Sequence, residues 1–148
     1  MKAVVQLVSQ ASVTVDRKIV GAIGHGLLVF LGVGQRDTEQ VADYLAAKIS
    51  GLRIFPDQNG QMNKSIQDVG GEMLVISQFT LFGNCRKGRR PSYNQAAPPE
   101  LANRLYQYFI NRIPSLGIKV SCGQFQATME VALVNQGPVT ILLDSEKP

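Results

Sequence analysis

Short apolar runs alternate with polar or glycine-containing turns through the first third of the chain. Runs of about four to eight residues that are rich in valine, isoleucine and leucine predict β-strands. Four such runs occupy residues 3–8, 12–15, 19–23 and 27–33. Because the turns that separate them are short, this part of the sequence predicts an antiparallel meander.

The pattern then changes to a helical period. Asp37 followed by Gln40 resembles a capping box, and the apolar residues that follow recur three and four positions apart. This spacing predicts an amphipathic helix over residues 38–50 that ends at Gly51. After Gly51 the apolar residues again occur in short runs of the kind that predict strands.

A second helix is predicted to begin at Pro98-Pro99-Glu100, with proline in the first turn and an acidic side chain near the positive end of the helix dipole. Pro114 and Gly117 end it. Its predicted apolar face comprises Leu101, Leu105, Tyr108, Phe109 and Ile113. The remaining strands are predicted at 53–55, 72–81, 119–123, 129–135 and 139–143, with a turn at 56–60 and irregular structure at 62–71.

This order of elements predicts an α+β fold, with a curved, barrel-like and mainly antiparallel sheet and two main helices packed outside it. The helices are too few to cross over between all the strands, as a doubly wound fold requires. With 148 residues and no linker, repeat or low-complexity tract, the chain is expected to form a single domain over residues 1–148.

Composition narrows the class of protein. The chain is 45% hydrophobic and 18% charged, as ordinary globular proteins are, so disorder is not expected. No apolar run approaches the roughly eighteen residues that a membrane span needs, and Met1-Lys2 leads directly into an apolar strand instead of a signal-type segment. We therefore expect no membrane partner and a cytoplasmic location.

The net charge of +4 is concentrated in one place. Arg86, Lys87, Arg89 and Arg90 supply four basic side chains within five residues, without an acidic one between them. Such a loop can meet phosphate groups locally. The alternative from the residues alone is a solvated surface loop.

The usual catalytic and metal-binding patterns are scarce. His25 is the only histidine, and Cys85 and Cys122 lack the spacing of a zinc or redox pair, so no metal and no cofactor are predicted. Glycines at 21, 24 and 26 precede an apolar strand instead of a helix, which argues against a nucleotide-binding loop.

Two polar stretches remain as candidates. Thr80 in SQFTL could be a nucleophile, but a threonine hydroxyl is a weak one without an activating base, and a structural role at a strand end is the alternative. Gly137-Pro138 in NQGPVT interrupts a strand-like run and marks an edge, a bulge or a turn. Taken alone, an X-Pro bond is expected to be trans.

Several motifs together resemble the D-aminoacyl-tRNA deacylases, also described as the D-tyrosyl-tRNA deacylase family. They are SQFTL at 77–81, CRKGRRPSY at 85–93, AAPPELA at 96–102, NQGPVT at 135–140 and the GLLVFLGV strand. The similarity runs from MKAVVQ to the LLDS near the C-terminus. It implies hydrolysis of the ester between a D-amino acid and the 3′-terminal adenosine of tRNA, with glycine accepted and L-aminoacyl-tRNA spared. It also implies a homodimer that needs no metal.

The resemblance assigns three groups of site residues. It implies a catalytic strand end, whose backbone N–H groups hold the ester carbonyl, at Ser77, Gln78, Phe79 and Thr80. It implies substrate-binding residues at Gly137, Pro138, Phe125 and Met129, with the Gly-Pro bond cis and reaching into the partner's site. It implies tRNA-binding residues at Arg86, Lys87, Arg89 and Arg90.

By the same resemblance, Thr80 positions the substrate, and the 2′-hydroxyl of the terminal adenosine assists attack by water. A non-catalytic RNA-binding module and a threonine-nucleophile hydrolase are the alternatives. Two departures from the family pattern are visible: Leu7 stands where arginine is common, and GQFQATM at 123–129 replaces GxFGAxM. For Phe125 and Met129, core packing is the alternative role.

Overall fold

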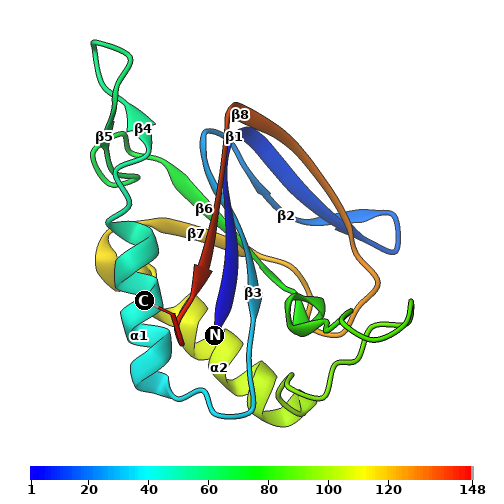
Figure 1. Cartoon of the computed structure of the whole chain (residues 1–148). Helices are drawn as coiled ribbons and strands as arrows, with labels where there is room; N and C mark the ends of the chain where they lie inside the picture. The colour runs from blue at the N-terminus through cyan, green and yellow to red at the C-terminus, as the bar shows by residue number, and fades with distance from the viewer. Residues whose placement is uncertain (148) are drawn as a thin grey trace.

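The computed structural model describes residues 1–147 (Figure 1). Its strands are β1 (Lys2–Val15), β2 (Lys18–Ile23), β3 (Gly26–Gly32), β4 (Phe55–Pro56), β5 (Met62–Lys64), β6 (Glu72–Ser77), β7 (Lys119–Cys122) and β8 (Glu130–Asp144). Its α-helices are α1 (Glu39–Ser50) and α2 (Pro99–Arg112), and two short 3-10 helices are η1 (Phe79–Phe82) and η2 (Pro114–Leu116). Within residues 1–147, no helix has both the length and the apolar character to cross a membrane.

The main sheet is mixed, in the order β2-β1-β3-β6-β7, with β8 paired to β1 as well. β1 pairs antiparallel with β2, β3 and β8, whereas β3, β6 and β7 run parallel to one another. The parallel half exists because α1 and α2 each lie in a crossover between two of these strands. The predicted α+β class is confirmed, and the sheet is mainly antiparallel as predicted, with a smaller parallel part formed by β3, β6 and β7.

The sheet curls until its two ends approach each other. A Cβ added to Gly21 in β2 would lie 2.7 Å from the carbonyl oxygen of Cys122 in β7. The Ser121 hydroxyl donates to the Ala22 carbonyl at 3.4 Å, which joins the same two strands. The sheet is therefore barrel-like and nearly closed, as predicted.

Two long strands replace four predicted short ones. β1 runs unbroken where strands 3–8 and 12–15 were expected, and β8 runs through both 129–135 and 139–143. The polar interruptions appear as shifts of register in the β1–β8 ladder, between Gln6 and Val8 and again between Val8 and Gln10. β1 and β8 thus remain continuous strands, but residues 136–139 of β8 bulge out of the ladder.

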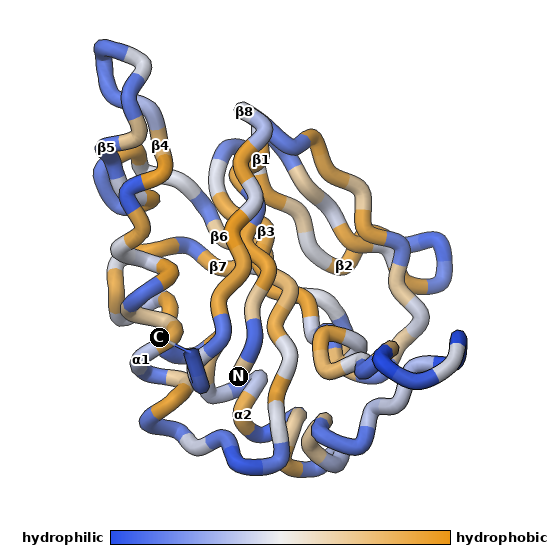
Figure 2. Tube along the Cα trace, viewed as in Figure 1, coloured by the Kyte–Doolittle hydropathy of each residue, from blue (hydrophilic) through white to orange (hydrophobic). Residues whose placement is uncertain are grey.

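The core has two parts, one on each face of the sheet. In β3, Leu27, Val29 and Leu31 pack against the helices, whereas Leu28 belongs to a smaller cluster inside the curled sheet with Val8. Because both faces are covered, the predicted run GLLVFLGV is almost continuously buried. Figure 2 shows hydrophobic residues along the central strands and hydrophilic ones at the loop tips.

The helices lie where the sequence predicts them, with local differences. Thr38, and not Asp37, caps α1, since its side chain accepts from the Val41 N–H at 3.4 Å. The Asp37 carboxylate instead accepts from the Gly34 N–H and the Met1 amino group. The buried face of α2 comprises Ala102, Leu105, Tyr106, Phe109 and Ile110. Tyr108, which was predicted to belong to the buried face, is only half-buried, and its hydroxyl bonds to Asp43. The prediction is wrong at this position.

The predicted strand at 53–55 and the irregular segment at 62–71 are both wrong in part. β4 and β5 pair antiparallel and form a small hairpin that projects from the body (Figure 1). The predicted turn at 56–60 lies at its tip, where Asp57 accepts from the N–H groups of Asn59 and Gln61. These bonds lower the pKa of Asp57, the Gln61 bond most.

Candidate active site

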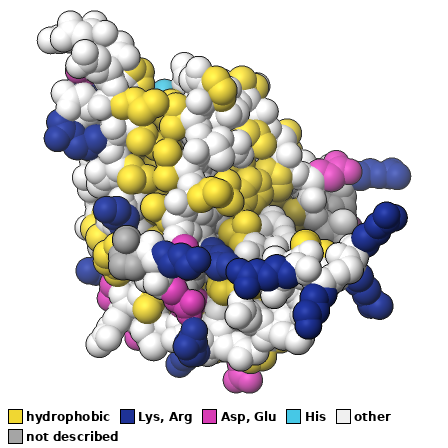
Figure 3. All heavy atoms as spheres, viewed as in Figure 1, with side chains coloured by type: hydrophobic (Ala, Val, Ile, Leu, Met, Phe, Trp, Pro, Cys, Tyr) yellow, Lys and Arg dark blue, Asp and Glu magenta, His cyan; other side chains and the backbone are white. Residues whose placement is uncertain are grey.

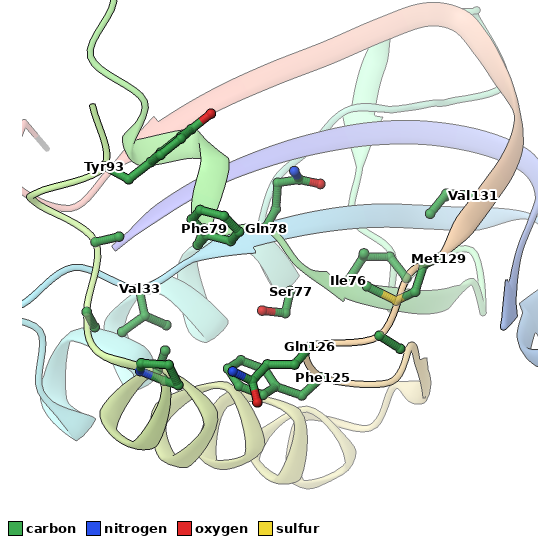
Figure 4. Close-up of a pocket in the computed structure, with 15 residues that line it drawn as sticks. Val33, Ile76, Ser77, Gln78, Phe79, Tyr93, Phe125, Gln126, Met129 and Val131 are labelled. Atoms are coloured by element: carbon green, nitrogen blue, oxygen red, sulfur yellow. The ribbon is translucent and has the colours of Figure 1, made fainter. Parts of the chain in front are cut away.

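A cavity of about 700 Å³ opens where β6 ends, beside the start of α2. One wall comes from β6 and η1, and the opposite wall comes from the loop before β8 (Figure 4). The segment 93–97 closes a third side. The lining residues are Val33, Ile76, Ser77, Gln78, Phe79, Tyr93, Ala96, Ala97, Pro99, Ala102, Phe125, Gln126, Ala127, Met129 and Val131.

The first wall is the SQFTL motif. The predicted strand 72–81 ends early at Ser77, and the chain turns into η1, which places Ser77, Gln78 and Phe79 along the cavity. The chain turns here because Phe82 is buried in the core. Its ring packs so close to Gly34 that a Cβ added to Gly34 would lie 2.9 Å from it. N–H groups at the start of a 3-10 helix have no partner within that helix. The Gln78 N–H already donates to the Leu31 carbonyl at 2.8 Å, so the groups open to a ligand are those of Phe79 and Thr80.

Thr80 differs from its three neighbours. It is exposed, it does not line the cavity, and its hydroxyl contacts the Gln78 side chain. The four residues therefore come together as one turn, but only three of them face the cavity. Gln78 lies between the cavity and Thr80.

The opposite wall is the GQFQATM loop. Phe125 and Met129 both line the cavity and also pack against the edges of the two core clusters, so the two roles considered for them coexist. Gly123 allows this packing, because a Cβ there would lie 2.6 Å from the Met129 sulfur. Gln126 has a positive φ of 63°, which turns the loop back towards β8.

The Tyr106 side chain packs behind both walls of the cavity. This residue was not identified from the sequence. It is 1% exposed, its hydroxyl donates to the Val75 carbonyl at 2.9 Å, and its ring lies 6.0 Å from the Phe125 ring. The Gly123 N–H donates to the same carbonyl at 3.2 Å. Burial raises the pKa of Tyr106, so its hydroxyl remains a donor at neutral pH. Continuing the helical spacing from Ala102 would have identified this residue.

Tyr93, which does line the cavity, is a second residue that sequence reasoning did not single out. It ends the basic stretch CRKGRRPSY and packs edge-on against Phe79, with ring centroids 5.1 Å apart. The signal was present in the sequence, since basic and aromatic side chains close together are the combination that binds single-stranded nucleic acid.

The Gly137–Pro138 pair lies elsewhere in the chain. It lies within β8, between Asn135, which pairs with Val8, and Thr140, which pairs with Gln6, and residues 136–139 form a bend without partners in β1. The cavity opens at the end of β6. The peptide bond is cis, as the resemblance implied and contrary to the expectation from the residues alone. Both residues are exposed, and neither lines the cavity.

The Asn135 side chain stabilises this bend. Its side-chain amide donates to the Leu7 carbonyl of β1 and to the Val139 carbonyl beyond the bend, both at 3.0 Å. Leu7 itself is 3% exposed and packs in the core. The bend is thus joined to β1 beside Leu7 by an amide from β8.

The basic loop projects beside η1. Arg86, Lys87, Arg89 and Arg90 are exposed, and the loop is closed at its base by paired backbone bonds between Asn84 and Ser92. In Figure 3, Lys and Arg side chains gather at the right edge of the face in view, where Figure 1 shows this loop. From its base the chain continues through Tyr93 to the cavity wall.

The cavity carries few groups that could transfer a proton. Its lining contains no Asp, Glu, His, Lys, Arg or Cys side chain. His25 lies in the turn before β3, with its ring packed edge-on against Phe55 at 5.3 Å. Residues 1–147 contain no group of three His, Cys, Asp or Glu side chains placed to hold a metal ion.

These features define a small α+β protein with an apolar, ligand-sized cavity at a strand end. Comparison with known proteins names the family. The family model described as D-Tyr-tRNA(Tyr) deacylase matches residues 4–144, and the chain belongs to this family of hydrolases. The resemblance noted in the sequence is thereby confirmed.

Individual relatives agree over the full length. A D-aminoacyl-tRNA deacylase of Desulfatibacillum aliphaticivorans is 61% identical over 146 residues, covering 99% of this chain and 100% of the relative. One of Thermotoga petrophila is 58% identical over 147 residues and covers 99% of both chains. A solved structure named c-Myc DNA Unwinding Element Binding Protein has 40% identity and a TM-score of 0.91, covering 97% of this chain and 98% of its own.

Proposed function

We propose that this protein hydrolyses the ester that links a D-amino acid to the 3′-terminal adenosine of tRNA, releasing the free D-amino acid and tRNA. L-aminoacyl-tRNA is spared, and the enzyme acts in the cytoplasm. The observation that carries the proposal is the cavity at the end of β6, lined by Ser77, Gln78 and Phe79, in a chain of the D-Tyr-tRNA(Tyr) deacylase family.

The chemistry assigned to the cavity relies on backbone groups and on the substrate. N–H groups at the Ser77–Thr80 turn hold the ester carbonyl and stabilise the negative charge that develops on its oxygen. Since the lining offers no carboxylate, imidazole or amine as a base, the 2′-hydroxyl of the terminal adenosine assists the attacking water. Thr80 positions Gln78 through the contact between their side chains.

Chiral selection is assigned to Gly137 and Pro138 of a second copy of the chain. Their backbone carbonyls capture the α-amino group of the substrate and leave no room for an L side chain, whereas glycine and D-residues fit. Two observations support a homodimer in which this bend enters the neighbouring cavity. The bend is exposed and lies outside the cavity of its own chain. Val134 and Leu142, on either side of it in β8, are 47% and 76% exposed.

The decisive test uses D-Tyr-tRNA and L-Tyr-tRNA in parallel. The proposal predicts release of D-tyrosine and little release of L-tyrosine, measured as loss of acid-precipitable label. Glycyl-tRNA is the third substrate and should also be cleaved. Equal inertness towards D- and L-Tyr-tRNA would instead favour a non-catalytic RNA-binding protein.

A second experiment separates substrate assistance from a threonine nucleophile. Thr80→Ala should retain measurable activity, because Thr80 lies outside the cavity lining. Wild-type enzyme should cleave D-aminoacyl-tRNA that ends in 2′-deoxyadenosine far more slowly than the normal substrate. An inactive Thr80→Ala variant together with normal cleavage of the deoxy substrate would assign the attack to Thr80.

The basic loop is proposed to bind phosphates of the acceptor end. Arg86, Lys87, Arg89 and Arg90 are exposed on a loop whose base leads into the cavity wall. Neutralising Arg89 and Arg90 with glutamine should weaken tRNA binding and reduce its dependence on salt concentration. An unchanged salt dependence would leave the loop as solvated surface.

A further inference from the structure

Two aromatic rings stand at the rim of the cavity, beside the base of the basic loop. Phe79 is 56% exposed although it belongs to a strongly apolar residue type, and Tyr93 is half-buried. Their rings are 5.1 Å apart and inclined by 68°. Figure 4 shows both on the same side of the cavity, across from Phe125 and Gln126. Part of each ring is therefore open to a ligand that crosses this rim.

Tyr93 also borders a second hollow. Together with Ala96 it lines both the cavity and a more open space of about 730 Å³. The other residues around this space are Gln35, Asn94, Pro98 and Leu101. The Gln35 side chain donates to the Asn94 backbone carbonyl, and the Gln35 N–H donates to the Gln95 carbonyl at 3.2 Å. These bonds fix the wall of the hollow to the end of β3.

The position of these rings matters for a substrate that ends in a single strand. If the terminal adenosine occupies the cavity, the preceding nucleotide has to leave over the rim towards the basic loop. Unpaired bases bind proteins chiefly by stacking on aromatic side chains, and amide side chains can hydrogen-bond their edges. Phe79 and Tyr93 supply the rings, and Gln35 and Asn94 supply the amides.

We propose that Phe79, Tyr93 and the adjoining hollow form a subsite for the nucleobase that precedes the terminal adenosine. This inference rests on the proposed function, because it takes the 3′ end of tRNA as the ligand. The subsite draws the single strand over the rim and directs its phosphates to the basic loop. If the two rings only anchored the basic loop, kcat/KM would be the same for substrates with and without that nucleotide.

The kinetic test compares two small substrates on the same enzyme preparation. One is D-tyrosyl adenosine, and the other is a D-tyrosyl CCA trinucleotide. The wild type should show a higher kcat/KM for the trinucleotide, and Tyr93→Leu should lower the ratio of the two values by roughly 5- to 150-fold, the range expected for one stacked base. Tyr93→Phe should preserve the ratio. Tyr44→Leu, which removes an exposed tyrosine from α1, is the matched control.

A binding test keeps the subsite separate from catalysis. An unacylated 3′ oligonucleotide with 2-aminopurine in the penultimate position should lose fluorescence on binding to the wild type and not on binding to Tyr93→Leu. This readout requires no hydrolysis. If the enzyme cleaves neither substrate but still quenches 2-aminopurine, the proposed function is contradicted and the subsite is not. The subsite is overturned by an unchanged kinetic ratio in Tyr93→Leu, or by unquenched 2-aminopurine bound to the wild type.

Discussion

The end of β6 and the bend of β8 are opposite in character. The first is a hollow of about 700 Å³ with apolar walls, and the second is an exposed projection of backbone around Gly137 and Pro138. The hollow has no charged side chain with which to fix an amino group, and the projection has no cavity of its own. Each region has what the other lacks, which is the basis for proposing a site assembled from two copies.

The same two regions are also held differently. The hollow is held by core packing, through Phe82 at the end of η1 and Tyr106 beneath the loop of Phe125. The projection is held by the two hydrogen bonds of the Asn135 side chain and by the burial of Val139 in the core. Because the projection is proposed to contact the substrate, we expect substitutions there to lower activity more than substitutions beneath the hollow do.

The largest effect is expected for Gly137→Ala. Gly137 has φ +110°, and an added Cβ would lie 2.7 Å from the Val139 side chain, so the bend must shift. A shift of about 1 Å in a substrate-positioning group can lower the rate on the order of 100-fold. Deacylation of D-Tyr-tRNA is the measurement, and Gly24→Ala is the control, because a Cβ at Gly24 meets no atom within 4 Å. Equal losses in both variants would contradict the assignment.

Asn135→Ala should have the next largest effect. It removes two hydrogen bonds of 3.0 Å that join the bend to β1 and to Val139. We expect kcat/KM to fall about 10-fold and the free energy of unfolding to fall by about 1–3 kcal/mol, since two carbonyls lose their partner. Gln136→Ala changes an exposed neighbour and should match the wild type. Retained activity in Asn135→Ala would show that the bend is held by other contacts.

Tyr106→Phe tests the support beneath the hollow. It deletes the bond from the Tyr106 hydroxyl to the Val75 carbonyl, which keeps its second bond from the Gly123 N–H. The free energy of unfolding should fall by about 1 kcal/mol, lowering Tm by roughly 2–4 °C, with only a few-fold loss of activity. Tyr108→Phe, also on α2, removes the bond to Asp43 of α1 and should leave kcat/KM unchanged. A loss of activity without any loss of stability in Tyr106→Phe would contradict a supporting role.

The sequence predicted well those features that depend on neighbouring residues. Both helices and the general course of the strands follow from local periodicity. β1 and β8 are each continuous where breaks were expected, because pairing along the partner strand is not encoded locally. Residues 136–139 have no partner in β1, which agrees with the bulge that was one of the structures expected at Gly137-Pro138. The early end of β6 was missed for a similar reason, since Phe82 turns into the core at Gly34.

The site residues also divide into those that local motifs identify and those that depend on contacts between distant segments. Ser77, Gln78, Phe79, Phe125 and Met129 were named from motifs, and the structure gathers all five around one cavity. Tyr93 lines that cavity and Tyr106 supports its wall only through packing between segments distant in sequence. Gly137 and Pro138 lie outside it, and no pattern within a single chain indicates which surface a second copy covers.

The claim that two copies complete one site can be tested by complementation. Ala127→Trp fills the cavity, and Gly137→Ala displaces the bend. Chains carrying one change each would be co-expressed with different affinity tags, and the mixed dimer purified. The account predicts that either variant alone is nearly inactive towards D-Tyr-tRNA, whereas the mixed dimer, with one intact site of two, recovers about half the wild-type activity. A mixed dimer as inactive as its parents, or chains that do not associate, would contradict it.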